Sequence, residues 1–236
     1  MSIKLGSLKT GSLTGATIVF DLDGTLVDTA PDLVGALNAL LREEALPALP
    51  LASARTMIGK GARALIERGF AQAGAVLPAD KVPALFDRFI EIYLGRIARE
   101  SVMFDDLETT LDLLAAEGAR LAVCTNKRTD LSLALLDALD LTRRFAAIIG
   151  PDRSPAPKPD PRHLLTAIRA AGGDPARALM VGDSISDVLA AKAAGVPVAV
   201  VSFGYTDTPA AELGGDVLID HFTELPAIAR RLLARA

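Results

Sequence analysis

The stretch Thr17–Thr25, T-I-V-F-D-L-D-G-T, decides the fold. Its first part, Thr17–Phe20, is a run of β-branched and apolar residues without alternation, which is typical of a strand buried on both faces of a parallel sheet. Asp21 and Asp23 follow where the strand ends, so extended backbone would direct both carboxylates to the same side. Ligands of open α/β sheets bind outside the carboxyl ends of the strands. Taken alone, the stretch is equally compatible with a D-G turn that carries two solvated aspartates.

The composition indicates a globular protein with a sizeable core. The chain has 236 residues, of which 50% are hydrophobic, and this length suits one large domain or one domain with an insert. A net charge of -4 without a basic stripe argues against a nucleic-acid partner. No apolar run reaches ~18 residues, so no membrane span is expected. Residues 1–15 lack the pattern of a secretion signal and are interpreted as a flexible arm.

The single cysteine bears on the location of the protein. Cys124 lies in an apolar segment, where a buried thiol is expected, and one cysteine cannot form an intramolecular disulfide. A single free cysteine is compatible with a reducing compartment. The sequence therefore favours a cytoplasmic protein, while it leaves the oligomeric state open.

Residues 28–104 show helical spacing without a strand pattern. Apolar side chains recur at spacings of three and four, which predicts helices with one apolar side. The expected helices run from Asp28 or Thr29 to Leu41 and over Ser53–Met57, Ala62–Ala73 and Asp80–Arg99. A helical block of this length predicts an inserted α-helical cap domain, hinged near Asp21 and placed to act as a lid.

From Asp105 onward, strand and helix patterns alternate. Strands are expected at Arg120–Cys124, Ala146–Ile149, Ala178–Val181, Val198–Val201 and Val217–Ile219. Helices are expected at Leu107–Glu117, Thr129–Leu139, Arg162–Ala171, Asp187–Ala194 and Thr223–Ala234. This alternation predicts an α/β fold with a doubly wound parallel sheet. The catalytic core would comprise residues 16–27 and 105–236, and the helical cap residues 28–104.

Polar residues follow four successive expected strands. They are Asp21 and Asp23 after the first strand, Thr125 and Asn126 after the second, Lys158 after the third, and Asp183 with Asp187 after the fourth. Each taken alone is compatible with a helix cap, a turn or a solvated lysine. Because the carboxyl ends of parallel strands meet at one edge, their joint occurrence predicts one shared site.

With these motifs in place, the chain resembles the phosphatases of the haloacid dehalogenase (HAD) superfamily. The resemblance extends from Thr17 to the C-terminus and rests on DLDGT at Asp21–Thr25, CTN at Cys124–Asn126, KP at Lys158–Pro159 and GDSISD at Gly182–Asp187. The insert is similar to the cap of the subgroup that acts on 2-phosphoglycolate. The resemblance implies a HAD-like Rossmannoid core, a small phosphorylated metabolite as substrate, and Mg²⁺ as cofactor.

Within this resemblance, the residue types indicate roles for the acids. Asp21, with an unperturbed pKa of about 3.9, is expected to attack phosphorus and form an aspartyl-phosphate. Asp23 would protonate the departing alkoxide and then accept a proton from water. Mg²⁺ would be held by Asp21, Asp183 and the backbone carbonyl of Asp23.

The other core residues are expected to contact the phosphoryl group or to support those that do. Lys158 would add positive charge beside it, and the Thr125 hydroxyl with the backbone near Gly24 and Asn126 would hold its oxygens. Asp187 is expected to orient Lys158 or a metal-bound water.

Four other functions are compatible with parts of this pattern. A dehalogenase of the same fold would lack an acid at the position of Asp23, because halide displacement produces no alkoxide. A signalling receiver domain would have no use for the long helical insert. A phosphosugar phosphatase or mutase, or a pyrophosphatase, would keep all the core motifs and differ in the cap. A non-catalytic phospho-ligand binding protein would lack a catalytic group, and none is missing.

Substrate choice is expected to lie in the cap. The turn Gly59-Lys60-Gly61 combines two glycines with positive charge, and Arg55 and Arg63 lie close to it in sequence. These three cations are hypothesised to bind a second anionic group of the substrate, such as the carboxylate of 2-phosphoglycolate. Solvated helix-face charges are the alternative interpretation.

Overall fold

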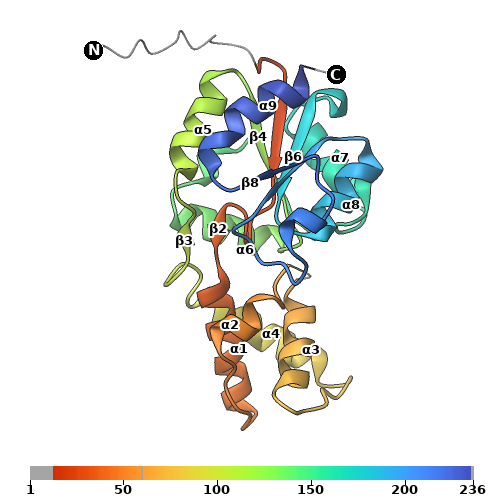
Figure 1. Cartoon of the computed structure of the whole chain (residues 1–236). Helices are drawn as coiled ribbons and strands as arrows, with labels where there is room; N and C mark the ends of the chain where they lie inside the picture. The colour runs from red at the N-terminus through yellow and green to blue at the C-terminus, as the bar shows by residue number, and fades with distance from the viewer. Residues whose placement is uncertain (1–12, 60, 235–236) are drawn as a thin grey trace, which may run out of the picture.

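The first strand lies in the middle of a six-stranded parallel sheet (Figure 1). The computed structural model describes residues 13–59 and 61–234. In the order β5-β4-β1-β6-β7-β8, the strands are Ala147–Ile149, Arg120–Cys124, Thr17–Phe20, Ala178–Gly182, Val198–Val201 and Val217–Ile219. Val19 of β1 pairs with Ala122 on one side and with Met180 on the other. The sheet confirms the predicted doubly wound α/β fold.

Helices cover both faces of the sheet, which explains why its strands show no alternation. Ile18 and Phe20 belong to one apolar cluster, and Val19, which points to the opposite face, belongs to another. The first cluster includes residues of α5 (Leu107–Ala116), α6 (Thr129–Ala138) and α9 (Leu225–Leu233). The second includes residues of α7 (Pro161–Ala170) and α8 (Ile185–Ala194). Cys124 is fully buried in this second cluster, as predicted.

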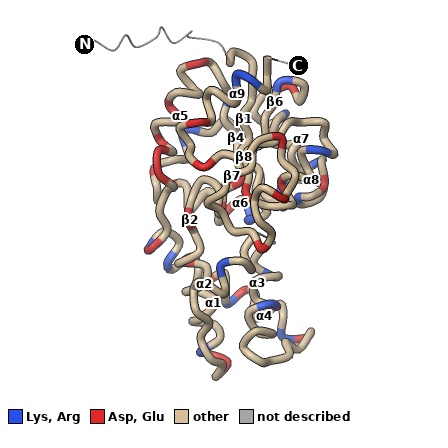
Figure 2. The backbone as a smooth tube through the Cα atoms, viewed as in Figure 1, with Lys and Arg blue, Asp and Glu red and all other residues tan. Residues whose placement is uncertain are grey.

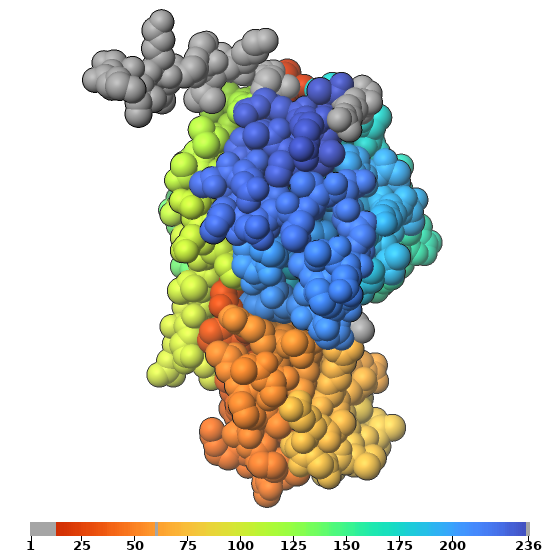
Figure 3. Space-filling model, in the orientation of Figure 1, coloured from red at the N-terminus to blue at the C-terminus, as the bar shows by residue number. Residues whose placement is uncertain are grey.

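A separate apolar cluster holds together the first four helices of the chain. These helices are α1 (Ala30–Glu43), α2 (Leu51–Arg55), α3 (Ala62–Gln72) and α4 (Val82–Leu94), and we refer to residues 30–94 as the helical insert. Phe89 and Leu37 are fully buried at its centre. Two residues from outside the insert, Leu131 and Tyr205, join the cluster. Figures 1 and 3 show the insert, in orange and yellow, at one end of the molecule below the sheet.

Two short strands at the joints of the insert correct the expectation that no strand interrupts residues 28–104. β2 (Val27–Asp28) and β3 (Val102–Met103) pair in an antiparallel ribbon at the start and end of the insert. Two-residue strands carry no readable periodicity, and their pairing joins segments far apart in sequence. The ribbon brings both connections to the same place, beside the loop that follows β1.

Several element ends differ from the expected ones. α4 ends at Leu94 rather than Arg99, and α8 begins at Ile185 rather than Asp187 because Ser184 and Asp187 form a capping box. Of the predicted N-terminal arm, residues 1–12 lie outside the described residues. Leu13, in contrast, is buried in the sheet domain and its backbone N–H donates to the Glu117 carbonyl.

Charged residues of both signs are interspersed along the chain, without a long run of either (Figure 2). Within residues 13–59 and 61–234, no helix combines the length and apolar character that crossing a bilayer requires. The absence of a nucleic-acid partner and the location in the cell stay predictions.

Asp32 binds the start of the insert to the segment that follows it. This α1 residue is fully buried, and its carboxylate accepts hydrogen bonds from the backbone N–H groups of Glu100 and Ser101 at 2.9 and 2.8 Å. The Ser101 hydroxyl donates at 2.7 Å, and Arg96 Nε at 3.2 Å. Although burial opposes it, this set of donors lowers the pKa of Asp32.

We expect Asp32→Ala to lower the free energy of unfolding by about 2–4 kcal/mol, because it leaves the backbone N–H of buried Ser101, the Ser101 hydroxyl and the Glu100 N–H without their acceptor. Urea unfolding at neutral pH measures the loss. Asp87→Ala on the exposed side of α4 serves as the matched control, and a change of similar size there would contradict the assignment. Because the folded pKa is lowered, the contribution of Asp32 is complete above its ordinary pKa and is lost as the pH falls through the folded value.

Candidate active site

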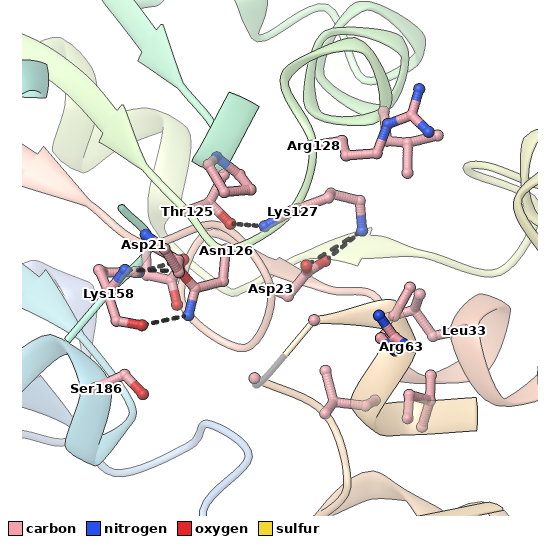
Figure 4. A pocket seen from close by; sticks show the side chains of 18 of the residues that line it. Asp21, Asp23, Leu33, Arg63, Thr125, Asn126, Lys127, Arg128, Lys158 and Ser186 are labelled. Atoms are coloured by element: carbon pink, nitrogen blue, oxygen red, sulfur yellow. Dashed lines mark hydrogen bonds and ion pairs between the residues drawn. The ribbon is translucent and has the colours of Figure 1, made fainter. Parts of the chain in front are cut away.

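Lys158 contacts several of the polar residues that follow the strands, and Figure 4 shows it next to Asp21 and Asn126. Its ammonium lies 2.9 Å from Asp21 Oδ1 and 2.7 Å from Asp187 Oδ1, and it donates to the Cys124 carbonyl at 2.7 Å. The Lys158 side chain is 1% exposed. Three acceptors therefore use the three N–H donors of a lysine that is almost completely buried. The structure thus brings Asp21, Lys158 and Asp187 together.

The loop that carries Lys158 is held by two side chains. Asn126 clamps its backbone: Asn126 Nδ2 donates to the Lys158 carbonyl at 3.1 Å, and the Lys158 N–H donates to Asn126 Oδ1 at 2.9 Å. The same N–H approaches His163 Nδ1 at 3.1 Å, while His163 Nε2 lies 3.2 Å from the Ile149 carbonyl. The Asn126 side chain is therefore engaged in positioning Lys158, a role that the sequence analysis did not foresee.

Asp183 lies opposite Asp21, at the end of β6. Its carboxylate accepts hydrogen bonds from the Thr25 hydroxyl at 3.2 Å and from the Tyr205 N–H at 2.6 Å. Gly24 has a φ of +82°, and a Cβ there would overlap the Asp183 carboxylate. The glycine after Asp23 is therefore required both by its backbone conformation and by the close approach of Asp183.

The acids at this edge outnumber the buried cation. One carboxylate oxygen from each of Asp21, Asp183 and Asp187 lies within 4.8 Å of the others, and all three residues are buried. Burial raises the pKa of Asp21 to about 6, although Lys158 opposes the shift. Burial and the charge of Asp21 raise the pKa of Asp183 well above its ordinary range. Such a cluster of oxygen donors with excess negative charge fits a divalent cation.

Asp23 faces away from this cluster and has other partners. Lys127 Nζ lies 2.9 and 3.1 Å from its two carboxylate oxygens, and the Thr29 hydroxyl donates to it at 2.6 Å. Thr125, next to this group, accepts a hydrogen bond from the Lys127 N–H at 3.2 Å. Figure 4 shows Lys127 reaching from the loop after β4 to Asp23. Lys127 was not predicted, although its place directly after Thr125 and Asn126 was a usable signal.

A cavity of about 570 Å³ connects these residues with the helical insert. The core lines it with Asp21, Asp23, Thr125, Asn126, Lys127, Arg128, Lys158 and Ser186, among others. The insert lines it with Gly59, Gly61, Arg63 and apolar side chains that include Leu65, Phe89 and Tyr93. A ligand bound to the strand ends would therefore also touch the insert.

Of the three cations predicted to bind the substrate, only Arg63 is found to line the cavity. Arg63 lines the cavity, with its guanidinium paired to Glu67. Arg55 is absent from the cavity lining; it pairs with Asp28 and lies over the Tyr205 ring, 5.2 Å from the centroid. The Tyr205 hydroxyl in turn donates to Asp28 at 2.5 Å. Arg55 thus joins the insert to the ribbon formed by β2 and β3. Lys60 lies outside the described residues.

Comparison with known proteins identifies the family. Residues 18–201 match the family described as haloacid dehalogenase-like hydrolase. The chain is 57% identical over 221 residues to the phosphoglycolate phosphatase of Caulobacter vibrioides, with 94% of this chain and 93% of that protein covered. It is 46% identical to the phosphoglycolate phosphatase of Agrobacterium fabrum, with 92% and 94% covered.

A solved structure agrees with these relatives. The crystal structure of a predicted phosphoglycolate phosphatase from Haemophilus somnus has a TM-score of 0.85 at 32% identity, with 92% of this chain and 98% of that chain covered. The chain therefore belongs to the haloacid dehalogenase-like hydrolases. Within that family it is a phosphomonoester hydrolase.

His163 makes the stability of the Lys158 loop dependent on pH. Burial and the charge of Lys158 lower the pKa of His163 to about 4. The unfolded chain, with an ordinary value of about 6.5, therefore binds a proton between these two values that the folded protein rejects. The contribution of His163 to stability is complete above pH 6.5 and falls as the pH is lowered to about 4.

We expect the wild type to lose about 2 kcal/mol more stability than His163→Gln between pH 7 and pH 4.5. Urea unfolding at the two pH values measures this difference, in which the titration of the other groups cancels. Equal losses in both proteins would show that His163 is not the titrating group.

Proposed function

We propose that this protein hydrolyses 2-phosphoglycolate to glycolate and phosphate, with Mg²⁺ bound and through an aspartyl-phosphate on Asp21. The observation that carries the proposal is the placement of Asp21 against Lys158 and close to Asp183, with Asp23 on the wall of the same cavity. The phosphoglycolate phosphatases of C. vibrioides and A. fabrum support the choice of substrate.

The donor set fits Mg²⁺, which prefers oxygen ligands. The carboxylates of Asp21 and Asp183 and the backbone carbonyl of Asp23 would hold the ion. Asp187 already accepts from Lys158 and from the Ser184 hydroxyl at 2.6 Å. We therefore assign it the role of holding Lys158 in place and not that of a metal ligand. When bound, the cation offsets the charge that builds up as an anionic nucleophile approaches an anionic phosphoryl group.

The first half of the reaction places the phosphoryl group on Asp21. A carboxylate oxygen of Asp21 forms a bond to phosphorus, and the bond from phosphorus to the ester oxygen breaks. Asp23, which lines the cavity, gives a proton to the departing alkoxide, so that glycolate leaves as an alcohol. The Lys158 ammonium, 2.9 Å from Asp21, stabilises the added negative charge on the phosphoryl oxygens.

The second half restores the enzyme. Asp23, now a carboxylate, accepts a proton from a water molecule whose oxygen attacks phosphorus. The bond between phosphorus and Asp21 breaks, phosphate forms, and Asp21 returns as a carboxylate. Thr125, buried at the end of β4 and lining the cavity, is placed to donate a hydrogen bond to a phosphoryl oxygen in both halves.

The cavity volume supports a second candidate. At about 570 Å³ the cavity exceeds the needs of a two-carbon phosphomonoester, so a phosphosugar phosphatase shares the same core chemistry. Release of phosphate from a panel of small phosphomonoesters distinguishes the two. We expect the highest kcat/KM for 2-phosphoglycolate, and a higher value for a phosphosugar would make the second candidate the function.

Chelation tests the metal assignment. We expect EDTA to abolish phosphate release and added Mg²⁺ to restore it, because unneutralised carboxylates repel the phosphoryl group. Mg²⁺ should also raise the Tm of the wild type and have little effect on Asp183→Asn, a readout that does not depend on activity. Full activity after complete chelation would contradict the metal site.

Two single substitutions separate the roles of the acids. Asp21→Asn should abolish both turnover and the phosphoenzyme, because an amide is a far poorer nucleophile. Asp23→Asn should lower kcat for an alkyl phosphate by about 10²–10⁴ and affect an activated aryl phosphate much less. Steady-state rates with both classes of substrate measure the contrast. Equal losses for the two leaving groups would rule out Asp23 as the general acid.

A further inference from the structure

The Lys127 ammonium is a buried cation on the wall of the cavity, directly beside Asp23. Its side chain is 5% exposed, and Nζ lies 2.9 Å from the nearer Asp23 oxygen. The ammonium also lies over the Tyr93 ring, 4.6 Å from the centroid. Burial alone would lower the pKa of Lys127, but Asp23 and Tyr93 outweigh it and raise the pKa, so the side chain is charged at neutral pH.

The Tyr93 hydroxyl is a buried donor without an acceptor beside this ammonium. Asp23 accepts from Lys127 at both of its oxygens, and the remaining side of the ammonium faces Tyr93. The Tyr93 hydroxyl donates to no described residue, although Tyr93 is only 1% exposed and lines the cavity. Burial raises the pKa of Tyr93 to about 12, so its hydroxyl keeps its proton and can donate. A buried donor without an acceptor, next to a buried ammonium, indicates a place for an anionic or strongly polar ligand group.

We propose that Lys127, assisted by Tyr93, binds the substrate carboxylate and makes the enzyme selective for phosphomonoesters with a carboxylate one carbon from the ester oxygen. The inference rests on the proposed function, in which Asp23 protonates that ester oxygen. In such a substrate a single methylene separates the ester oxygen from the carboxylate. A carboxylate so close to Asp23 lies within reach of the Lys127 ammonium, which contacts Asp23. In a longer substrate the distal group would lie beyond the reach of Lys127.

The two arginines that line the cavity are less suited to this role, and the Lys158 donors are already taken by Asp21, Asp187 and the Cys124 carbonyl. Arg63 is paired with Glu67 and 68% exposed, and Arg128 is paired with Asp130 and 45% exposed. Solvent screens both guanidiniums, whereas attraction to a buried ammonium is about fourfold stronger, if the effective dielectric constant falls from about 80 to about 20. Lys127 therefore contributes more to carboxylate recognition than either arginine.

The test compares two substrates that differ in the group to be recognised. 2-Phosphoglycolate carries the carboxylate, and 2-hydroxyethyl phosphate carries a neutral hydroxyl at the same place. We expect Lys127→Met to lower the ratio of their kcat/KM values about 10- to 100-fold, as for the loss of a charge-assisted hydrogen bond. The contact with Asp23 is lost for both substrates and cancels in the ratio. Lys192→Met, at an exposed position of α8, is the matched control and should leave the ratio unchanged.

A second variant keeps the charge and removes only the hydroxyl. Tyr93→Phe preserves the aromatic packing and should lower the same ratio about 3- to 10-fold. An unchanged ratio in both variants, with activity lost equally for the two substrates, would overturn the proposal and leave Lys127 a role through Asp23 alone. A larger fall in the ratio for Arg63→Met or Arg128→Met would also overturn it.

The outcome for the wild type separates this inference from the proposed function. A wild type without preference for 2-phosphoglycolate would refute the proposed substrate itself. A wild type that prefers it, and a Lys127→Met variant that retains the preference, would refute only the assignment of the carboxylate to Lys127. If Lys127→Met fails to fold, the Tyr93→Phe ratio decides.

Discussion

The Lys158 ammonium holds together a group of carboxylates that would otherwise repel one another. It contacts Asp21 at 2.9 Å and Asp187 at 2.7 Å, with Asp183 in the same cluster. A buried cation among buried anions is stable only if its donors are satisfied, and the Cys124 carbonyl takes the remaining one. The surrounding loops serve this arrangement: Asn126 and His163 fix the Lys158 backbone, and Gly24 allows Asp183 to approach the loop after β1.

A second ion pair, between Lys127 and Asp23, occupies the side of the site that faces the helical insert. In the proposed function, the first pair would lie where the phosphoryl group is transferred and the second where the rest of the substrate binds. Tyr93 of α4 contacts Lys127 from the insert, and Arg55 of α2 binds Asp28 in the β2–β3 ribbon. The insert is therefore connected to the chemistry through side chains on two of its helices.

Much of the fold and the core of the site could be predicted from the sequence, because both depend on local patterns. Buried parallel strands appear as unbroken apolar runs, so β1, β4, β6 and β7 were readable. Residues at the ends of such strands meet at one edge, so Asp21, Lys158 and Asp183 could be assigned to one place. Element ends were less predictable where a side-chain cap decides them, as Ser184 and Asp187 do for α8.

The sequence by itself determined the α/β class, the helical insert and the motifs that resemble the haloacid dehalogenase superfamily. Only the tertiary structure decided which cations face the cavity. Arg55 pairs with Asp28 outside the cavity, whereas Lys127 is buried against Asp23 inside it, and neither partner is indicated by the neighbouring sequence. The two-residue strands β2 and β3 were also decided there, because their pairing joins distant segments. The physical reason is the same in each case: partners come from separate elements, and no local periodicity records which elements will pack together.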